Sequence, residues 1–169
     1  LLDKRLLEKC KGAEIIDVGK RAGLHAFKQE EINEILYQKS LQANTVVRLK
    51  GGDPFLFGRG AEEARYLKDR GVMVKVVPGV SSAIAVPELC GIPITHREYA
   101  SHVTIVTGHE MVGRTEGRLD WELMAKMNGT IVILMGMSNH ERLSTMLLNG
   151  GLPDGTPVAV IVQGSSSDQ

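Results

Sequence analysis

The sequence predicts an α/β fold made of two α/β domains with mainly parallel sheets. Short apolar runs of strand length alternate with segments whose apolar residues recur at helical spacing, and glycine or proline closely follows the runs. Strands that alternate with helices require right-handed crossover connections, which produce parallel sheets. The periodicity breaks down between residues 92 and 100. We therefore expect an N-terminal domain over residues 1–96 and a C-terminal domain over residues 97–169.

The first of these domains is expected to alternate between helices and strands. Apolar residues at helical spacing predict helices over residues 1–9, 29–41, 61–70 and 80–89. Gly71 is expected to end the third helix, and Pro87 to kink or end the fourth. Near-continuous apolar runs predict strands over residues 14–18, 46–49 and 72–77.

The second domain continues the pattern. Asp120 is expected to cap a helix that runs through residue 127. Ser138 and Glu141 have the spacing of a capping box, and the helix that follows them carries Leu143, Met146 and Leu147 on its predicted buried face. Apolar runs predict strands over residues 102–106, 130–135 and 157–162.

Composition and charge exclude several classes of function. The chain has 169 residues, of which 43% are hydrophobic, and its 20 basic and 20 acidic residues balance, so no electrostatic footprint for nucleic acid or an anionic membrane is present. Cys10 and Cys90 are far apart and form no metal-type pair, which suits a reducing compartment, and we expect no bound metal. Apolar runs are too short to span a membrane and no signal-peptide pattern is visible, so a cytoplasmic location is expected.

The chain is organised around a glycine-rich loop that follows the predicted strand 46–49. Gly51, Gly52 and Asp53 begin this loop, and Gly58 and Gly60 close it before a helical pattern resumes. Ligands of open parallel sheets lie beyond the carboxyl ends of the strands, and glycines allow the backbone to approach a ligand closely. The loop lacks the endings and spacings of nucleoside-triphosphate and dinucleotide loops. A tight connection without a ligand is the alternative.

Four strings, taken together, closely resemble the tetrapyrrole methylase family, whose members use S-adenosylmethionine. They are GGDPFLFGRG at residues 51–60, VGKRAG at 18–23, QEEIN at 29–33 and GIPITHR at 91–97. The resemblance extends over nearly the whole chain. It implies an enzyme that binds S-adenosyl-L-methionine in a cleft between two α/β domains and releases S-adenosyl-L-homocysteine.

The resemblance also implies which residues bind the cofactor. A ligand with an apolar adenine and a charged amino-acid end requires backbone donors and acceptors, hydroxyl groups and an apolar wall. The positions that match are Gly51, Gly52, Asp53, Leu56, Ser81, Ser82, Met135 and Gly164. Each has a plainer interpretation: Met135 as core, both serines as helix caps, and Asp53 as the first residue of an Asx turn.

Within the family, the chemistry implied is C-methylation of uroporphyrinogen III, twice, to give precorrin-2 for sirohaem and cobalamin. Lys20 matches the lysine that the family treats as a proton donor, although an exposed lysine in a turn is ordinarily only solvated. The octacarboxylate substrate requires cations, because guanidinium groups pair with carboxylates. Plausible substrate contacts, each with an ordinary ion pair as its alternative, are Arg21, His25, Arg59, His96 and Arg97.

The resemblance implies two further expectations about the chain itself. Family members begin with a strand, a loop and an aspartate base that would lie upstream of Leu1, so an N- and C-terminally incomplete chain is expected. A homodimer is also expected from the family. Two alternatives are a methylase of a later corrin precursor, which residues 18–23 and the Arg59 loop argue against, and a non-catalytic domain that binds S-adenosylmethionine or is purely structural.

Overall fold

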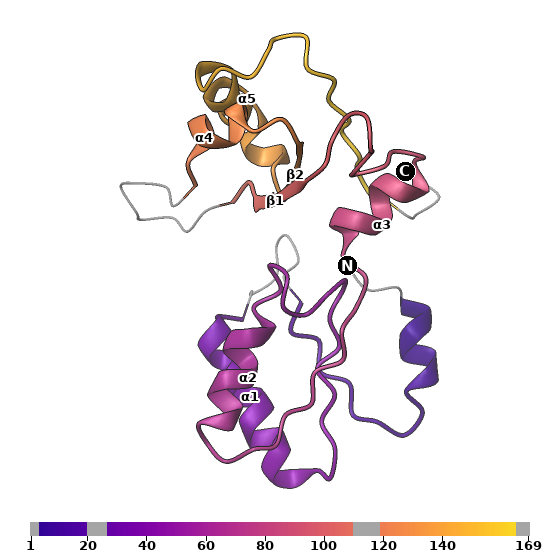
Figure 1. Cartoon of the computed structure of the whole chain (residues 1–169). Coiled ribbons are helices and arrows are strands. Elements are labelled where there is room, and N and C mark those ends of the chain that lie inside the picture. Colours follow the sequence, from indigo (N-terminus) through magenta and orange to yellow (C-terminus); the bar gives the residue numbers. More distant parts are fainter. Residues whose placement is uncertain (1–3, 20–26, 110–118, 165–169) are drawn as a thin grey trace. The chain divides into compact units, whose positions relative to one another are not determined.

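The computed structural model describes residues 4–19, 27–109 and 119–164. The backbone divides into two compact units, Leu1–Val80 and Ser81–Gln169, which are described separately (Figure 1). Helix α3, Ser82–Leu89, belongs to the second unit because it contacts strand β2 of that unit. The boundary between residues 96 and 97 that the sequence suggests stays a prediction.

Two α-helices form the packed part of the first unit. These are α1, Gln29–Gln42, and α2, Gly60–Lys68, and they contact each other through a small core that contains Ile32, Leu36 and Ala64. Both predicted helices are thereby confirmed. A 3₁₀-helix, η1, covers Lys4–Lys9 in place of the predicted α-helix at residues 1–9.

The end of α2 is set by glycine, as predicted. Gly71 has a φ of 78°, a left-handed conformation that glycine adopts without steric cost. The N–H of Gly71 bonds to the carbonyl of Lys68 at 3.0 Å, and the N–H of Val72 bonds to the carbonyl of Leu67 at 3.0 Å. Carbonyl groups of the last helical turn, which have no partner within the helix, are hydrogen-bonded in this way, and the helix ends.

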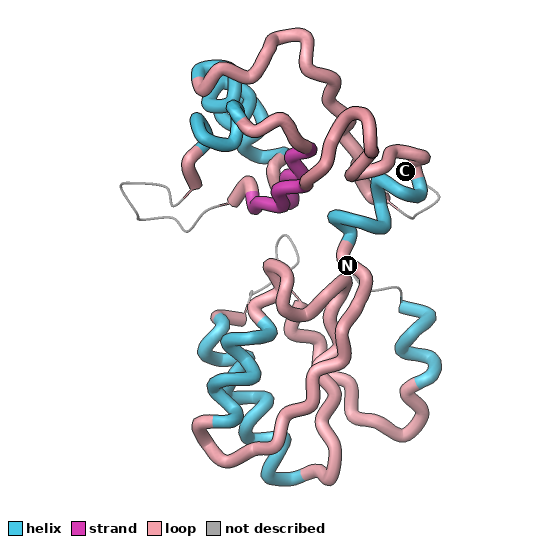
Figure 2. The backbone as a smooth tube through the Cα atoms, in the orientation of Figure 1, coloured by secondary structure: helices cyan, strands magenta, loops and turns pink. Residues whose placement is uncertain are grey.

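The three strands predicted in the first unit are not strands. Residues 14–18, 46–49 and 72–77 run as loops (Figure 2), and no backbone hydrogen bond joins them within the described residues. Their apolar side chains are largely open to solvent, with Val47 77% and Val77 71% exposed. An apolar β-branched run indicates a preference for extended backbone, but a strand also requires a partner about 4.8 Å away.

The second unit contains the parallel sheet. Strand β1, Val103–Thr107, pairs in parallel with β2, Thr130–Leu134, in a register that sets Val103 opposite Thr130. Helix α4, Trp121–Lys126, lies between them in sequence, and α5, His140–Asn149, follows β2 after a 3₁₀ turn, η2, at Met137–Asn139. Parallel strands with intervening helices confirm the α/β class.

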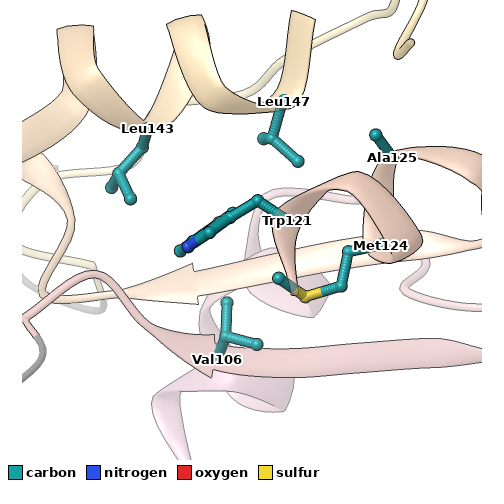
Figure 3. Packing of buried hydrophobic residues seen from close by; sticks show 6 residues of the cluster. All are labelled: Val106, Trp121, Met124, Ala125, Leu143 and Leu147. Atoms are coloured by element: carbon teal, nitrogen blue, oxygen red, sulfur yellow. The ribbon is translucent and has the colours of Figure 1, made fainter. Parts of the chain in front are cut away.

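A hydrophobic cluster fills the space between these elements. The side chains converge from β1, α4 and α5 (Figure 3), and Trp121, the largest of them, is 6% exposed. The members are Val106, Trp121, Met124, Ala125, Leu143 and Leu147. Burial of this apolar surface is what holds α4 and α5 against the sheet.

Local signals in the second unit had mixed outcomes. Asp120 caps α4 as predicted, because its Oδ1 accepts a hydrogen bond from the N–H of Leu123 at 2.8 Å. The capping box at Ser138 is wrong, since α5 begins at His140 and its N-cap, Asn139, makes no side-chain cap bond. The predicted strand 157–162 is a loop in which Val158 is 81% exposed. None of the helices described is long and apolar enough to cross a membrane.

Candidate functional site

The loop of residues 51–60, called here the 51–60 loop, is held by the carboxylate of Asp53. Its Oδ1 accepts hydrogen bonds from the N–H of Phe55 at 2.8 Å and of Leu56 at 3.2 Å. Its Oδ2 accepts from the N–H of Gly79 at 3.1 Å. The bond from Gly79, then that from Phe55, lowers the pKa of Asp53, because donors stabilise the ionised carboxylate. The side chain therefore makes the predicted Asx turn and ties a second loop to it.

Glycines of this site face protein backbone at close range. A Cβ on Gly60 would lie 2.5 Å from the carbonyl oxygen of Pro54, to which the N–H of Gly60 donates at 3.0 Å. A Cβ on Gly79 would overlap the carbonyl oxygen of Gly52 and come within 3.0 Å of its carbonyl carbon. Gly52 itself has a φ of 68°. At these positions glycine serves first to bring two backbone segments together.

Among the described residues, left-handed backbone in residues other than glycine occurs in or beside the predicted site loops. Within the described part of the chain the four such residues are Phe57, Arg59, Met135 and Gln163, with φ between 52° and 57°. Arg59 and Met135 were themselves predicted as site residues, while Phe57 follows Leu56 and Gln163 precedes Gly164. Side chains other than glycine are uncommon in this region, and such residues concentrate at functional sites.

In the second unit, one predicted site residue, Met135, directly follows the carboxyl end of β2, beside the end of β1. The N–H of Gly108 bonds to the carbonyl of Leu134 at 2.8 Å, and a Cβ on Gly108 would overlap the Cα of Gly136. Asn139 Nδ2 donates to the carbonyl of Gly108 at 2.9 Å. The side chain of Met135, 57% exposed, therefore projects from a closely held strand end instead of filling the core.

Ser81, Ser82 and Gly164 were each predicted either to bind the cofactor or to have a structural role. Ser81 is 8% exposed, and its Oγ accepts a hydrogen bond from the N–H of Ala83 at 3.2 Å, so it is the N-cap of α3. Ser82 is the exposed first residue of that helix. Gly164 packs against the side chain of Val86, where a Cβ would not fit.

Of the five cations predicted to bind the substrate, the structure describes Arg59, His96 and Arg97. Arg59 donates to both carboxylate oxygens of Glu62, at 3.0 and 2.6 Å, and this hydrogen bonding raises the pKa of Arg59. His96 and Arg97 lie on an exposed turn, where His96 Nδ1 accepts from the N–H of Glu98 at 3.2 Å. Lys20, Arg21 and His25 fall in 20–26, outside the described residues.

One pair of charged residues beside the loop escaped the sequence analysis. Glu63, on α2, is buried and bonds to Lys50, which directly precedes Gly51. A signal for it existed: Gly60, Glu63 and Ala64 share a helix face at spacings of three and four residues, and this face is buried. A carboxylate on the inner face of a helix indicates a buried polar partner. No group of three or more metal-ligating side chains occurs among residues 4–19, 27–109 and 119–164.

This chain has an α/β fold in which glycine-rich loops with left-handed backbone follow apolar segments. Such loops are typical of α/β proteins that bind small molecules. The family described as Tetrapyrrole (Corrin/Porphyrin) Methylases matches residues 2–169. The chain belongs to the tetrapyrrole methylase family. This membership confirms the resemblance on which the site residues were chosen.

Relatives share this sequence at high identity. The chain is 54% identical over 157 residues to the S-adenosyl-L-methionine-dependent uroporphyrinogen III methyltransferase of Methanosarcina barkeri, covering 93% of this chain and 62% of the relative. It is 52% identical to the uroporphyrinogen-III C-methyltransferase of Methanocaldococcus jannaschii, covering 100% of this chain and 70% of the relative. The chain thus spans between three fifths and three quarters of these relatives' length.

A solved structure is similar in fold. It is the uroporphyrin-III C-methyl transferase of Thermus thermophilus complexed with S-adenyl homocysteine, which is 41% identical and superposes with a TM-score of 0.63. The match covers 73% of this chain and 52% of that one. Fold likeness at this identity agrees with the α/β class.

Proposed function

We propose that this protein is an S-adenosyl-L-methionine-dependent C-methyltransferase that converts uroporphyrinogen III to precorrin-2 by two methyl transfers. The observation that carries the proposal is the coincidence of strained backbone with the predicted cofactor positions, at or beside Leu56, Met135 and Gly164. Backbone strain persists where the surrounding structure fixes it for a purpose such as ligand binding. Relatives named for this reaction, and one crystallised with S-adenyl homocysteine, indicate the ligand.

The residues present suit that cofactor. Leu56 and Met135 offer apolar surface for an adenine, and Gly51 and Gly52 are exposed backbone with no side chain in the way of polar ligand groups. Asp53 contributes by holding the 51–60 loop, because its carboxylate accepts three hydrogen bonds from backbone N–H groups of the protein. When bound, the cofactor supplies an electrophilic methyl group on sulfur.

The chain's own residues then act mainly by positioning. Methyl transfer from a sulfonium requires the attacking carbon to be held in line with the S–CH₃ bond, and it needs little covalent help. We assign Lys20 as a proton donor to the substrate. Arg59 keeps guanidinium N–H groups beyond the two bonds to Glu62, and it can offer these to a substrate carboxylate. Arg21, His25, His96 and Arg97 are proposed to add positive charge around the substrate.

Homodimerisation and a cytoplasmic location are part of the same proposal. The homodimer is proposed from the family resemblance, and the cytoplasmic location from a sequence that shows neither a membrane-length apolar run nor a signal-peptide pattern. Analytical ultracentrifugation of the purified protein at two concentrations tests the first. A sedimentation coefficient of a monomer at both concentrations would contradict it.

Two measurements test the function. Calorimetric titration with S-adenosylhomocysteine reports cofactor binding, and transfer of a labelled methyl group to uroporphyrinogen III reports turnover. We expect Lys20→Ala to abolish most turnover while cofactor binding is kept, and the exposed Lys68→Ala on α2 to leave both unchanged. Full activity of Lys20→Ala would remove Lys20 from the mechanism. Turnover of a later corrin precursor but not of uroporphyrinogen III would overturn the substrate assignment.

A further inference from the structure

A buried carboxylate lies beneath the 51–60 loop. Glu63 is 4% exposed, and its two oxygens accept hydrogen bonds from Lys50 Nζ at 3.0 and 3.2 Å. Its Oε1 also accepts from Arg48 Nε at 3.4 Å and from Gln29 Nε2 at 3.2 Å. Gln29 in turn donates to Asn33, another buried polar residue, at 3.1 Å. Donors from α1 and from the segment before the loop therefore converge on one carboxylate of α2.

The buried positive charge of Lys50 is compensated by the carboxylate of Glu63. The Lys50 side chain is only 13% exposed, compared with 31% for Arg48, so Lys50 is the more deeply buried of the two cations. A buried charge is tolerated only when it is paired and hydrogen-bonded, because desolvation is otherwise uncompensated. Lys50 and Glu63 therefore fix each other's position more firmly than a surface ion pair would.

The pair closes the base of the 51–60 loop. Lys50 directly precedes Gly51, and the backbone N–H of Glu63 bonds to the carbonyl of Arg59 at 3.2 Å, near the end of the loop. The Cε of Lys50 also lies 3.3 Å from the position that a Cβ on Gly58 would occupy. One ion pair thus links the residue before the loop to the helix turn after it.

We propose that Lys50 and Glu63 are positioning residues for the cofactor: their ion pair holds the 51–60 loop in the conformation that binds S-adenosylmethionine. The inference rests on the proposed function, since that function supplies the ligand. Its physical basis is preorganisation, because a loop already held in its binding conformation loses less entropy when the ligand binds.

The test uses four variants. Lys50→Met removes the positive charge and Lys50→Arg keeps it. Glu63→Gln removes the negative charge, and Lys50→Met/Glu63→Gln removes both. Asp69→Asn is the control, because Asp69 is an exposed carboxylate at the C-cap of the same helix, away from Glu63 in the first turn, and pairs with Arg65 at 3.8 Å. Two readouts are measured on each purified protein. They are the affinity for S-adenosylhomocysteine by calorimetry and the amide hydrogen exchange of peptides that cover residues 51–60, compared with those covering α5.

We expect Lys50→Met and Glu63→Gln each to weaken binding about tenfold or more and to speed exchange in the loop but not in α5. The double variant should lose little more than the worse single variant, and Lys50→Arg should recover binding. Unchanged exchange in the loop, or unchanged affinity in a variant whose loop exchanges faster, would overturn the inference. Failure of the unaltered protein to bind S-adenosylhomocysteine would instead overturn the proposed function, while loop exchange would still report whether the pair holds the loop.

Discussion

The carboxylate of Asp53 accepts the backbone N–H of Gly79 at 3.1 Å, and this bond joins two loops that lie far apart in the sequence. The same carboxylate holds Phe55 and Leu56 in its own loop. One side chain therefore sets both the shape of the 51–60 loop and its distance from the turn at Gly79. An ionised carboxylate has acceptor oxygens for all three of these N–H groups, whereas a side chain with a single acceptor oxygen does not.

Asp53→Asn is expected to weaken S-adenosylhomocysteine binding about tenfold. An asparagine side chain has one acceptor and one donor group, so its NH₂ must face either Gly79 or the N–H groups of Phe55 and Leu56. Two N–H donors that face each other form no hydrogen bond, so the variant loses either the bond to Gly79 or the bonds to Phe55 and Leu56. Calorimetry measures the change, with the exposed Asp154→Asn as the control. Equal affinity of the Asp53 variant and the unaltered protein would show that the loop does not need this charge.

The pKa of Asp53 also predicts a pH dependence. Backbone donors, Gly79 foremost, lower this pKa in the folded state. A group with a lowered folded pKa contributes stability that is complete above its unfolded pKa, about 3.9, and is lost as the pH falls through the folded value. The difference in thermal midpoint between the unaltered protein and Asp53→Asn should therefore be constant at neutral pH and shrink only below about pH 4. A difference that changes between pH values near neutrality would contradict this assignment.

Gly79→Ala is expected to destabilise the first unit by about 1–3 kcal/mol. The added Cβ would overlap the carbonyl oxygen of Gly52, which belongs to the backbone and cannot rotate away. Gly155→Ala is a matched control, because no atom lies within 4 Å of the added Cβ. Urea unfolding gives the free energy of unfolding of each variant. Similar losses in both variants would indicate a general effect of alanine instead of this contact.

Sequence reasoning identified features whose cause is local. Asp120 caps α4 and Gly71 ends α2, because each depends on hydrogen bonds within a few residues. Leu143 and Leu147 are buried as predicted, since helical spacing alone places them on one face. Parallel pairing was also predictable, because alternating strands and helices leave few other arrangements.

Features with a nonlocal cause could not be predicted in the same way. The runs at 46–49 and 72–77 have strand composition but no ladder partner among the described residues, and composition carries no information about partners. The contact of Asp53 with Gly79 and the burial of Glu63 likewise depend on segments brought together by folding. For the candidate site, sequence reasoning proposed the loops, but it could not predict the left-handed backbone of Met135, directly after β2.

Leu147→Ala is expected to destabilise the second unit by about 2–5 kcal/mol. Leu147 is 8% exposed and packs in the cluster around Trp121, so the deletion leaves a cavity that the neighbours fill only in part. Leu148→Ala, at a position 48% exposed on the same helix, should change stability by no more than about 0.5 kcal/mol. Urea unfolding followed by Trp121 fluorescence compares the two. Equal losses would mean that α5 is not packed in the register described.

Met135→Gly separates stability from binding at the end of β2. Met135 has a φ of 57°, which disfavours a residue with a Cβ by about 1–2 kcal/mol, whereas glycine adopts it freely. Glycine also gains about 0.5–1 kcal/mol of conformational entropy in the unfolded chain, so the free energy of unfolding should stay level or rise by up to about 1.5 kcal/mol. Affinity for S-adenosylhomocysteine should fall, because the exposed side chain of Met135 is the apolar surface proposed to meet the ligand. Met137→Gly is the control, since Met137 is similarly exposed at 52% but lies in the 3₁₀ turn that follows. A Met135 variant that loses stability and keeps its affinity would show that this methionine supports the fold and not the ligand.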